Sequence, residues 1–190
     1  MEAHVRLDSA QLRTLAHPLR ARMLGELRLR GRATATDLAR VLATNTGATS
    51  YHLRQLADVG LVREDQEPGS GRRRFWLPAH ASHGWTRADF EGDPDDEAAS
   101  DWLSAFGFRA SAERAEAWVK AQSTYPPEWR DAAEYGDTLI ELAPAQLKAL
   151  MADLFAVVQG YRARPADPGA DVRRVYLTVQ GFPLIEEENR

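Results

Sequence analysis

Cysteine is absent from this chain of 190 residues, so the chain forms no disulfide and offers no thiolate to a metal ion. Long apolar runs are absent as well, and none approaches the ~20 residues that a helix needs to span a bilayer. The opening residues, 1–6, lack the apolar core of a secretory signal. We therefore expect a cytoplasmic protein with no membrane partner.

Catalytic motifs are also missing. The sequence has no glycine-rich loop of the types that hold phosphates, and no serine in a nucleophile-elbow pattern. His80, His83, Asp89 and Glu91 are close in sequence, but scattered polar residues in a connecting segment explain them more simply than a metal site does. We expect no enzyme activity and no cofactor.

Charge is divided unevenly along the chain. Residues 1–80 carry 13 arginines and 8 acidic residues, a net charge of +5, whereas residues 81–190 carry 11 basic and 20 acidic residues, a net charge of −9. A basic first part is suited to binding a polyanion, and the acidic second part is then expected to bind something else. The arginine bias itself runs through both parts, with lysine only at Lys120 and Lys148, and is typical of a genome rich in G and C. The asymmetry, rather than the arginine content, therefore points to nucleic acid.

Four short helices are predicted in the first sixty residues. Asp8 is a good cap for the first helix, and Pro18 stands at a favoured first position of the second. Thr34 opens a third helix with a capping-box pattern. Asn45 caps a fourth helix that runs to about Asp58.

Two strands, 61–65 and 72–77, are predicted after the fourth helix. They flank the turn-rich segment 67–71, which reads Glu-Pro-Gly-Ser-Gly. Closely spaced helices followed by a hairpin predict a winged helix-turn-helix DNA-binding domain over residues 1–80.

Residues 81–97 contain glycine, proline and an acidic run, which predicts a linker. Residues 98–190 are then expected to form a helical dimerisation and effector domain with short strands at 138–142 and 175–179. The fold class that we expect is mainly α with a small β content, in which the winged helix-turn-helix precedes a C-terminal α+β dimerisation and effector region.

The fourth predicted helix has two distinct faces. At 100° per residue, Thr49, Leu53 and Leu56 fall on one side, which we expect to be buried. A small residue near the helix start permits close approach to a groove, and an arginine one turn later suits guanine or a phosphate. The residues expected to contact DNA on this helix are Thr46, Gly47, Ser50, Tyr51, His52 and Arg54. Among them, His52 lies at the side of the helix nearest the core. For His52 we favour a structural role or a phosphate contact over direct reading of a base.

Three consecutive arginines, Arg72, Arg73 and Arg74, begin the second predicted strand. Because side chains alternate along a strand, Arg72 and Arg74 point one way while Arg73 and Phe75 point the other. Charge on an edge strand also protects it against unwanted pairing. Beside a recognition helix we favour contact with a minor groove or its phosphates, which would steepen the salt dependence of binding.

Several stretches together resemble the ArsR-type winged-helix regulators. They are 15–20 (Leu-Ala-His-Pro-Leu-Arg), 36–39, 49–56 and 60–62. The resemblance covers roughly residues 9–80, and it implies a homodimer on a pseudo-palindromic operator, with two recognition helices about 34 Å apart on double-stranded DNA.

Metal sensing is frequent in that family, through a cysteine pair on the first motif helix or through Asp and His pairs on a C-terminal dimer helix. Here residues 36–39 hold no thiol and no histidine follows His83. We therefore expect a regulator that does not sense metals.

Aromatic residues are concentrated in the second half, where they are candidates for a small-molecule pocket. The candidate pocket residues are Trp102, Phe106, Trp118, Tyr125 and Trp129. The same residues fit an ordinary core and dimer interface, and no particular effector follows from them.

The function that we expect is sequence-specific DNA binding by a homodimeric transcriptional regulator, with repression favoured over activation. The alternative is a winged-helix module that binds protein and has no specific affinity for DNA.

Overall fold

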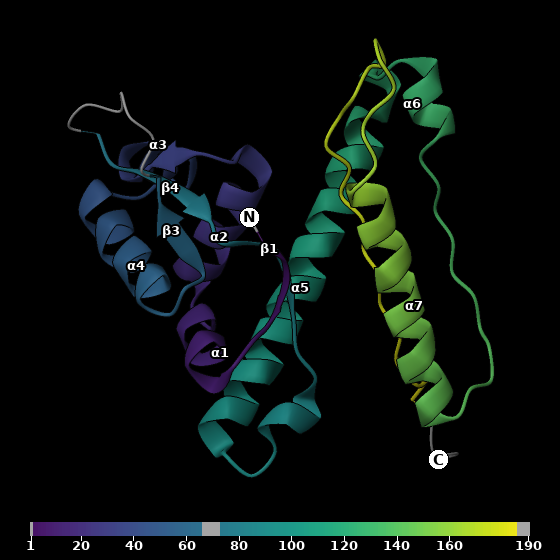
Figure 1. Cartoon of the computed structure of the whole chain (residues 1–190), viewed down its shortest axis with the longest axis horizontal. Coiled ribbons are helices and arrows are strands. Elements are labelled where there is room, and N and C mark those ends of the chain that lie inside the picture. The colour runs from purple at the N-terminus through teal and green to yellow at the C-terminus, as the bar shows by residue number, and fades with distance from the viewer. Residues whose placement is uncertain (1, 66–72, 186–190) are drawn as a thin grey trace. The chain divides into compact units, whose positions relative to one another are not determined.

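The computed structural model describes residues 2–65 and 73–185 (Figure 1). Helices make up most of its regular structure and the strands form two small sheets, which confirms the expected class, mainly α with a small β content. Within the described ranges, no helix is both long enough and apolar enough to cross a membrane. The chain divides into two compact units, Met1–Ala112 and Glu113–Arg190, and each is described by itself.

The four predicted helices of the first unit are confirmed. They are α1 (Ser9–Leu15), α2 (Pro18–Arg30), α3 (Ala35–Val41) and α4 (Thr46–Asp58). The predicted caps are present, because the side chains of Asp8, Thr34 and Asn45 each accept a backbone N–H from the first turn of the helix they precede. Local sequence signals therefore set the boundaries of these helices.

A three-stranded antiparallel sheet contains the predicted hairpin. Its order is β2 (Ala33–Thr34), β4 (Phe75–Pro78), β3 (Val62–Glu64), with Glu64 opposite Trp76. Strand β3 lies against α4, as Figure 1 shows. The predicted tip of the hairpin, 67–71, and Arg72 lie outside the described residues.

The structure differs from the prediction over residues 81–97, which are built into the first unit rather than forming a linker. Strand β5 (His80–Gly84) pairs in parallel with β1 (Glu2–Arg6), an N-terminal strand that no sequence pattern predicted. The 3-10 helix η1 (Arg87–Phe90) follows, and Phe90 is buried. The long helix α5 (Pro94–Ala121) then begins, and its first turns supply Leu103 to the core.

The acidic run that suggested a linker has a structural role instead. Arg13 of α1 donates to Asp93 at 2.6 Å and also to Asp96. Asp93 in turn accepts the backbone N–H groups of Asp95 and Asp96 in the first turn of α5. The acidic residues thus begin α5 and fasten it to α1, and the boundary between units falls at residue 112.

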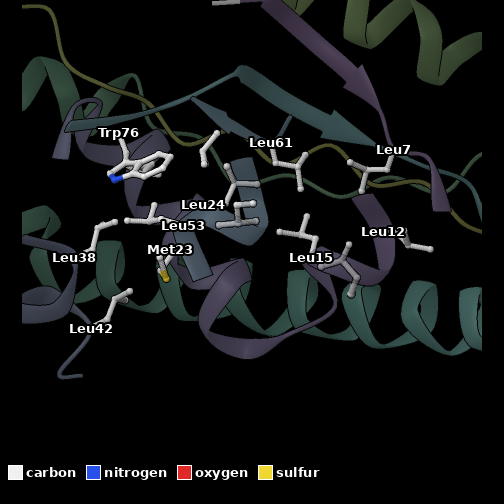
Figure 2. Packing of buried hydrophobic residues seen from close by; sticks show 14 of the residues in the cluster. Leu7, Leu12, Leu15, Met23, Leu24, Leu38, Leu42, Leu53, Leu61 and Trp76 are labelled. Carbon is white, nitrogen blue, oxygen red and sulfur yellow. The ribbon is translucent and has the colours of Figure 1, made fainter. Parts of the chain in front are cut away.

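One apolar cluster holds the first unit together (Figure 2). Trp76 of β4 contributes to it beside leucines from the helices, and Leu61 belongs to it just before β3. Each fully buried leucine contributes roughly 1.5–3 kcal/mol through removal of apolar surface from water. Its fully buried large apolar members are Leu12, Leu15, Met23, Leu24, Leu27, Leu38, Leu53, Leu56 and Leu61.

The second unit contains the 3-10 helix η2 (Gln122–Thr124), α6 (Pro127–Asp131) and α7 (Pro144–Arg162). The strands predicted at 138–142 and 175–179 are wrong, because neither segment pairs with a strand among residues 2–65 and 73–185. Their β-branched and leucine side chains are instead exposed, as at Leu139 (76% exposed) and Val175 (71%). No described residue from 113 to 185 is buried.

Candidate nucleic-acid interface

Helices α3 and α4 form a helix-turn-helix whose turn is tight. Ala43 has a φ of 50°, in the left-handed region, and the N–H of Thr44 returns to the carbonyl of Ala39 at 2.9 Å. The hydroxyl of Thr49, fully buried in α4, donates to the carbonyl of Ala35 at 2.9 Å. These bonds fix the angle at which α4 is presented.

The two faces of α4 are arranged as its periodicity predicts. Thr49, Leu53 and Leu56 are its buried residues, which confirms the expected inner face. Four of the predicted contact residues are exposed: Thr46, Gly47, Tyr51 and Arg54. Ser50 and His52 are half-buried.

The start of α4 is suited to a phosphate or a base edge. Asn45 caps it by accepting the N–H of Ala48 at 2.8 Å, and Thr46 and Gly47 lie exposed beside the cap. The first N–H groups of a helix have no acceptor within the helix and attract anions. A Cβ at Gly47 would lie 3.2 Å from the Asn45 Oδ1 that makes the cap, so the glycine leaves room for the cap.

A polar network joins α4 to the start of α2. The Gln55 side chain donates to the Tyr51 hydroxyl at 3.0 Å and accepts from Arg20 at 2.8 Å. Its Oε1 also lies 3.2 Å from Nδ1 of His52, whose ring centroid is 4.6 Å from that of His17. His52 is therefore directed toward α2.

Arg20 and Gln55 lie in the stretches 15–20 and 49–56 that resemble ArsR-type regulators, but the sequence alone indicated no part for them in the site. His17 adds to this network by accepting the N–H of Leu19, which caps α2. Burial of its ring lowers the pKa of His17, with further lowering by the Arg20 and His52 charges. A neutral His17 is what the cap requires, because Nδ1 must accept.

We call the β3–β4 hairpin the wing. Arg74 pairs with Glu64 on the opposite strand at 3.0 Å, so part of its charge is compensated. Arg73 is exposed next to it. Together they border a shallow hollow of about 380 Å³ beside the start of α3, whose other lining residues are Thr34, Ala35, Thr36, Asp37 and Arg40.

Arg32 fastens the base of the wing, a role that sequence reasoning missed. Its Nε lies 2.6 Å from a carboxylate oxygen of Asp65, which is nearly buried. Its guanidinium also lies 3.9 Å from the centre of the Phe75 ring. One arginine therefore contacts the residue that follows β3 and the first residue of β4, which holds the two strands of the wing together at its base.

The predicted pocket residues fall into two sets, one in each unit. Trp102 and Phe106 stack with ring centroids 5.2 Å apart, and Trp102 packs against the core of the first unit. Trp118 and Tyr125 pack edge to face at 4.9 Å in the second unit, and Trp129 lies in α6 there. The structure thus gives the five residues no common setting within one unit.

The histidines near residue 80 are engaged in packing. Arg28 donates to Nδ1 of His83, and burial together with this cation lowers the pKa of His83 to about 3. Asp89 pairs with Arg6 at 2.6 Å, which lowers the pKa of Asp89 to about 2. Over residues 2–65 and 73–185, no group of three or more histidine, aspartate or glutamate side chains is placed to hold a metal.

Solved structures with some likeness include a transcriptional regulator homologue from Pyrococcus horikoshii OT3, with 21% identity over 52% of this chain and 86% of that chain. RV1404 from Mycobacterium tuberculosis has 15% identity over 80% of each chain, and the adhesin competence repressor from Streptococcus pyogenes has 13% identity over 78% of this chain and 83% of that one. All three have a TM-score of 0.33, which is too low to support an argument about this chain.

Among curated proteins, none matches this chain. A family model described as a helix-turn-helix domain matches residues 15–65, the span from the end of α1 to the end of the first wing strand. This chain therefore carries a helix-turn-helix domain with a β-hairpin wing.

Proposed function

We propose that this protein is a sequence-specific, DNA-binding transcriptional regulator that acts as a homodimer in the cytoplasm. The observation that carries the proposal is the arrangement of α4. Its inner face is fixed to α3 and the core, while its start, Tyr51 and Arg54 remain exposed beside an arginine-bearing wing. An exposed helix with small polar residues first and a cation one turn later fits a major groove.

Each residue of the interface has a separate task in this proposal. Thr46 and Gly47 bring the start of α4 to the DNA backbone, Ser50 and Tyr51 lie over the groove, and Arg54 contacts guanine or a phosphate. Arg73 and Arg74 supply phosphate contacts from the wing, together with Arg72. His52, held between His17 and Gln55, positions α4.

Dimerisation is assigned to the second unit. Large apolar side chains are exposed along α7 and the segments beside it, including Leu154, Phe155 and Ile140, and no described residue there is buried. A unit that leaves such side chains in water gains stability by burying them against a second copy. Two copies of α4, about 34 Å apart, would then match a pseudo-palindromic operator.

Repression is the proposed mode, since a dimer on two successive major grooves excludes other proteins by occupancy alone. The proposed signal is not a metal, because His17, His52 and His83 are already engaged in capping and in side-chain contacts. The second unit is the proposed place for a small-molecule effector.

The test is selection of binding sites from random DNA, followed by mobility-shift titration of the selected duplex and of the protein's own promoter region. We expect an enriched motif with two inverted half-sites. Arg54→Ala should weaken binding by about 1–3 kcal/mol if Arg54 contacts a base. The variant should also discriminate less between bases at one position of the binding site. Arg109→Ala, which removes an exposed arginine from α5, is the charge-matched control.

Two outcomes contradict the proposal. Equal, weak affinity for all duplexes would favour the winged-helix module that binds protein. Unchanged affinity in both Arg54→Ala and the triple Arg72→Ala, Arg73→Ala, Arg74→Ala variant would show that α4 and the wing are not the DNA interface.

A further inference from the structure

A cation already lies among aromatic rings in the second unit. The guanidinium carbon of Arg173 is 5.0 Å from the ring centroid of Tyr125 and 5.6 Å from that of Trp129. Trp118 supports Tyr125 edge-on, with the ring centroids 4.9 Å apart. Cations are attracted to aromatic faces within about 6 Å of the ring centre. We call Trp118, Tyr125 and Trp129 the aromatic cage.

A carboxylate completes the setting of this cation. Asp171 accepts a hydrogen bond from Nε of Arg173 at 2.9 Å and another from the indole N–H of Trp129 at 2.9 Å. Nη2 of Arg173 also lies 2.9 Å from the same oxygen of Asp171. These donors lower the pKa of Asp171, so the carboxylate stays charged at neutral pH. Aromatic faces and a fixed anion together are what a planar guanidinium requires.

Arg173 is held only loosely. Its side chain keeps 36% of its surface exposed and that of Asp171 keeps 52%, so water reaches both. Exposed ion pairs contribute little to stability because water screens them and ordering the side chains costs entropy. Arg173 also comes from a segment that is neither helix nor strand, so its departure breaks no backbone ladder. An outside cation of the same kind can therefore compete for the cage.

A second contact fastens the same segment. The guanidinium of Arg114 in α5 lies 4.8 Å from the ring centroid of Tyr176. Residues 171–176 thus supply one cation, Arg173, to two aromatic rings and present one ring, Tyr176, to the cation of Arg114. Displacing Arg173 removes its two ring contacts and leaves the contact between Arg114 and Tyr176.

We propose that the aromatic cage and Asp171 form a binding site for a small organic cation bearing a guanidinium group, which enters by displacing the side chain of Arg173. Binding itself is independent of DNA. The use of this site by an effector rests on the proposed regulatory function, in which loss of the Arg173 contacts loosens residues 171–176, alters the second unit and hence the dimer.

The test uses the full chain without DNA and methylguanidinium as the probe, at constant ionic strength. The readout is the NMR resonance of the Trp129 indole N–H, assigned from its loss in Trp129→Phe. We expect a saturable shift in wild type and an apparent Kd about tenfold lower in Arg173→Ala, because the tethered arginine no longer competes. Tetramethylammonium, which has no N–H to donate to Asp171, should bind more weakly.

Arg164→Ala is the matched control, because it removes another cation–aromatic contact, 4.0 Å from the Tyr161 ring, outside the cage. It should bind the probe as wild type does, whereas Asp171→Asn should lose most of the affinity. If Arg173→Ala does not fold, Arg173→Gln replaces it. A shift that fails to saturate in wild type and in the Arg173 variant, or equal affinities in the Asp171→Asn and wild-type proteins, overturns the proposal. Either result leaves the DNA-binding function to be judged by its own experiment.

Discussion

The Thr49 hydroxyl and the Ala35 carbonyl, 2.9 Å apart, join the exposed helix of the helix-turn-helix to the helix that supports it. Thr49 is fully buried, and it is the one polar side chain among the inward-facing residues Thr49, Leu53 and Leu56 of α4. A buried hydrogen bond is directional, whereas apolar packing is not, so this contact fixes the rotation of α4 about its axis. The outward direction of Arg54 follows from it.

Replacing Thr49 with valine tests this contact. The shape is kept while the donor is lost, so we expect a loss of about 1–2 kcal/mol in the free energy of unfolding, measured by urea denaturation. DNA affinity should fall by more than the loss of folded protein explains, because the rotation of α4 about its axis is no longer fixed. Thr46→Val, at an exposed position beside the cap, should leave the unfolding free energy nearly unchanged. If Thr49→Val and Thr46→Val change the unfolding free energy equally, the Thr49 hydrogen bond does not fix the rotation of α4.

The charge on the wing should determine part of the salt dependence of DNA binding. Each phosphate contact contributes about 0.9 to the slope of log affinity against log salt concentration. We expect the double variant Arg73→Ala, Arg74→Ala to lower that slope by about 1–2 in mobility-shift titrations.

Glu64→Gln is the informative partner variant, because it releases Arg74 from its ion pair. The slope should then become steeper while the wing keeps its shape. A slope that is unaffected by either substitution would mean that the described part of the wing makes no phosphate contact.

Acid should destabilise the first unit before its carboxylates titrate. The unfolded chain binds a proton at His83 below its ordinary pKa of 6.5, but the folded chain binds it only near 3. Between these values the unfolded state holds more protons, so stability is complete above pH 6.5 and falls as the pH is lowered toward 3. The expected loss is about 1.4 kcal/mol per pH unit over the steep part of this range.

The measurement is urea unfolding at pH 7, 6 and 5. His83→Gln keeps an acceptor for Arg28 but does not titrate, so its pH dependence should be much flatter than that of wild type. His17, whose pKa is also lowered, leaves a residual slope of the same sign in both proteins. Parallel curves for wild type and His83→Gln would contradict this prediction.

The apolar face of α7 should determine the oligomeric state. Leu154, which is 39% exposed, is one of the apolar side chains of α7 that we propose to be buried against a second copy. Leu154→Glu places a charge in that interface, so we expect monomers in sedimentation velocity and weaker binding to a two-half-site operator. Asp153→Asn, at the neighbouring exposed position, should remain dimeric. A monomeric wild type would contradict the homodimer, and a dimeric Leu154→Glu variant would place the dimer interface outside α7.

The sequence by itself determined the helix-turn-helix and the inner face of α4. Caps, proline and helical periodicity act within a few residues, so Asp8, Thr34, Asn45 and the set Thr49, Leu53, Leu56 were predictable from local pattern. The same local signals failed at residues 81–97, where glycine, proline and acidic residues suggested a linker. There β5 pairs with a strand some eighty residues away and Asp93 meets Arg13, and neither partner is visible in a local window.

Only the tertiary structure showed how the wing and α4 are held in place and which of the candidate residues contact one another. Arg32 reaches across the base of the wing to Asp65 and Phe75, and Gln55 joins Tyr51 to Arg20. The aromatic residues that sequence grouped as one pocket separated into two units, and only the structure brought Arg173 and Asp171 to Tyr125 and Trp129. Helix boundaries follow from local backbone chemistry, whereas ion pairs, cation–aromatic contacts and strand pairing join residues distant in sequence, so they exist only once the chain is folded.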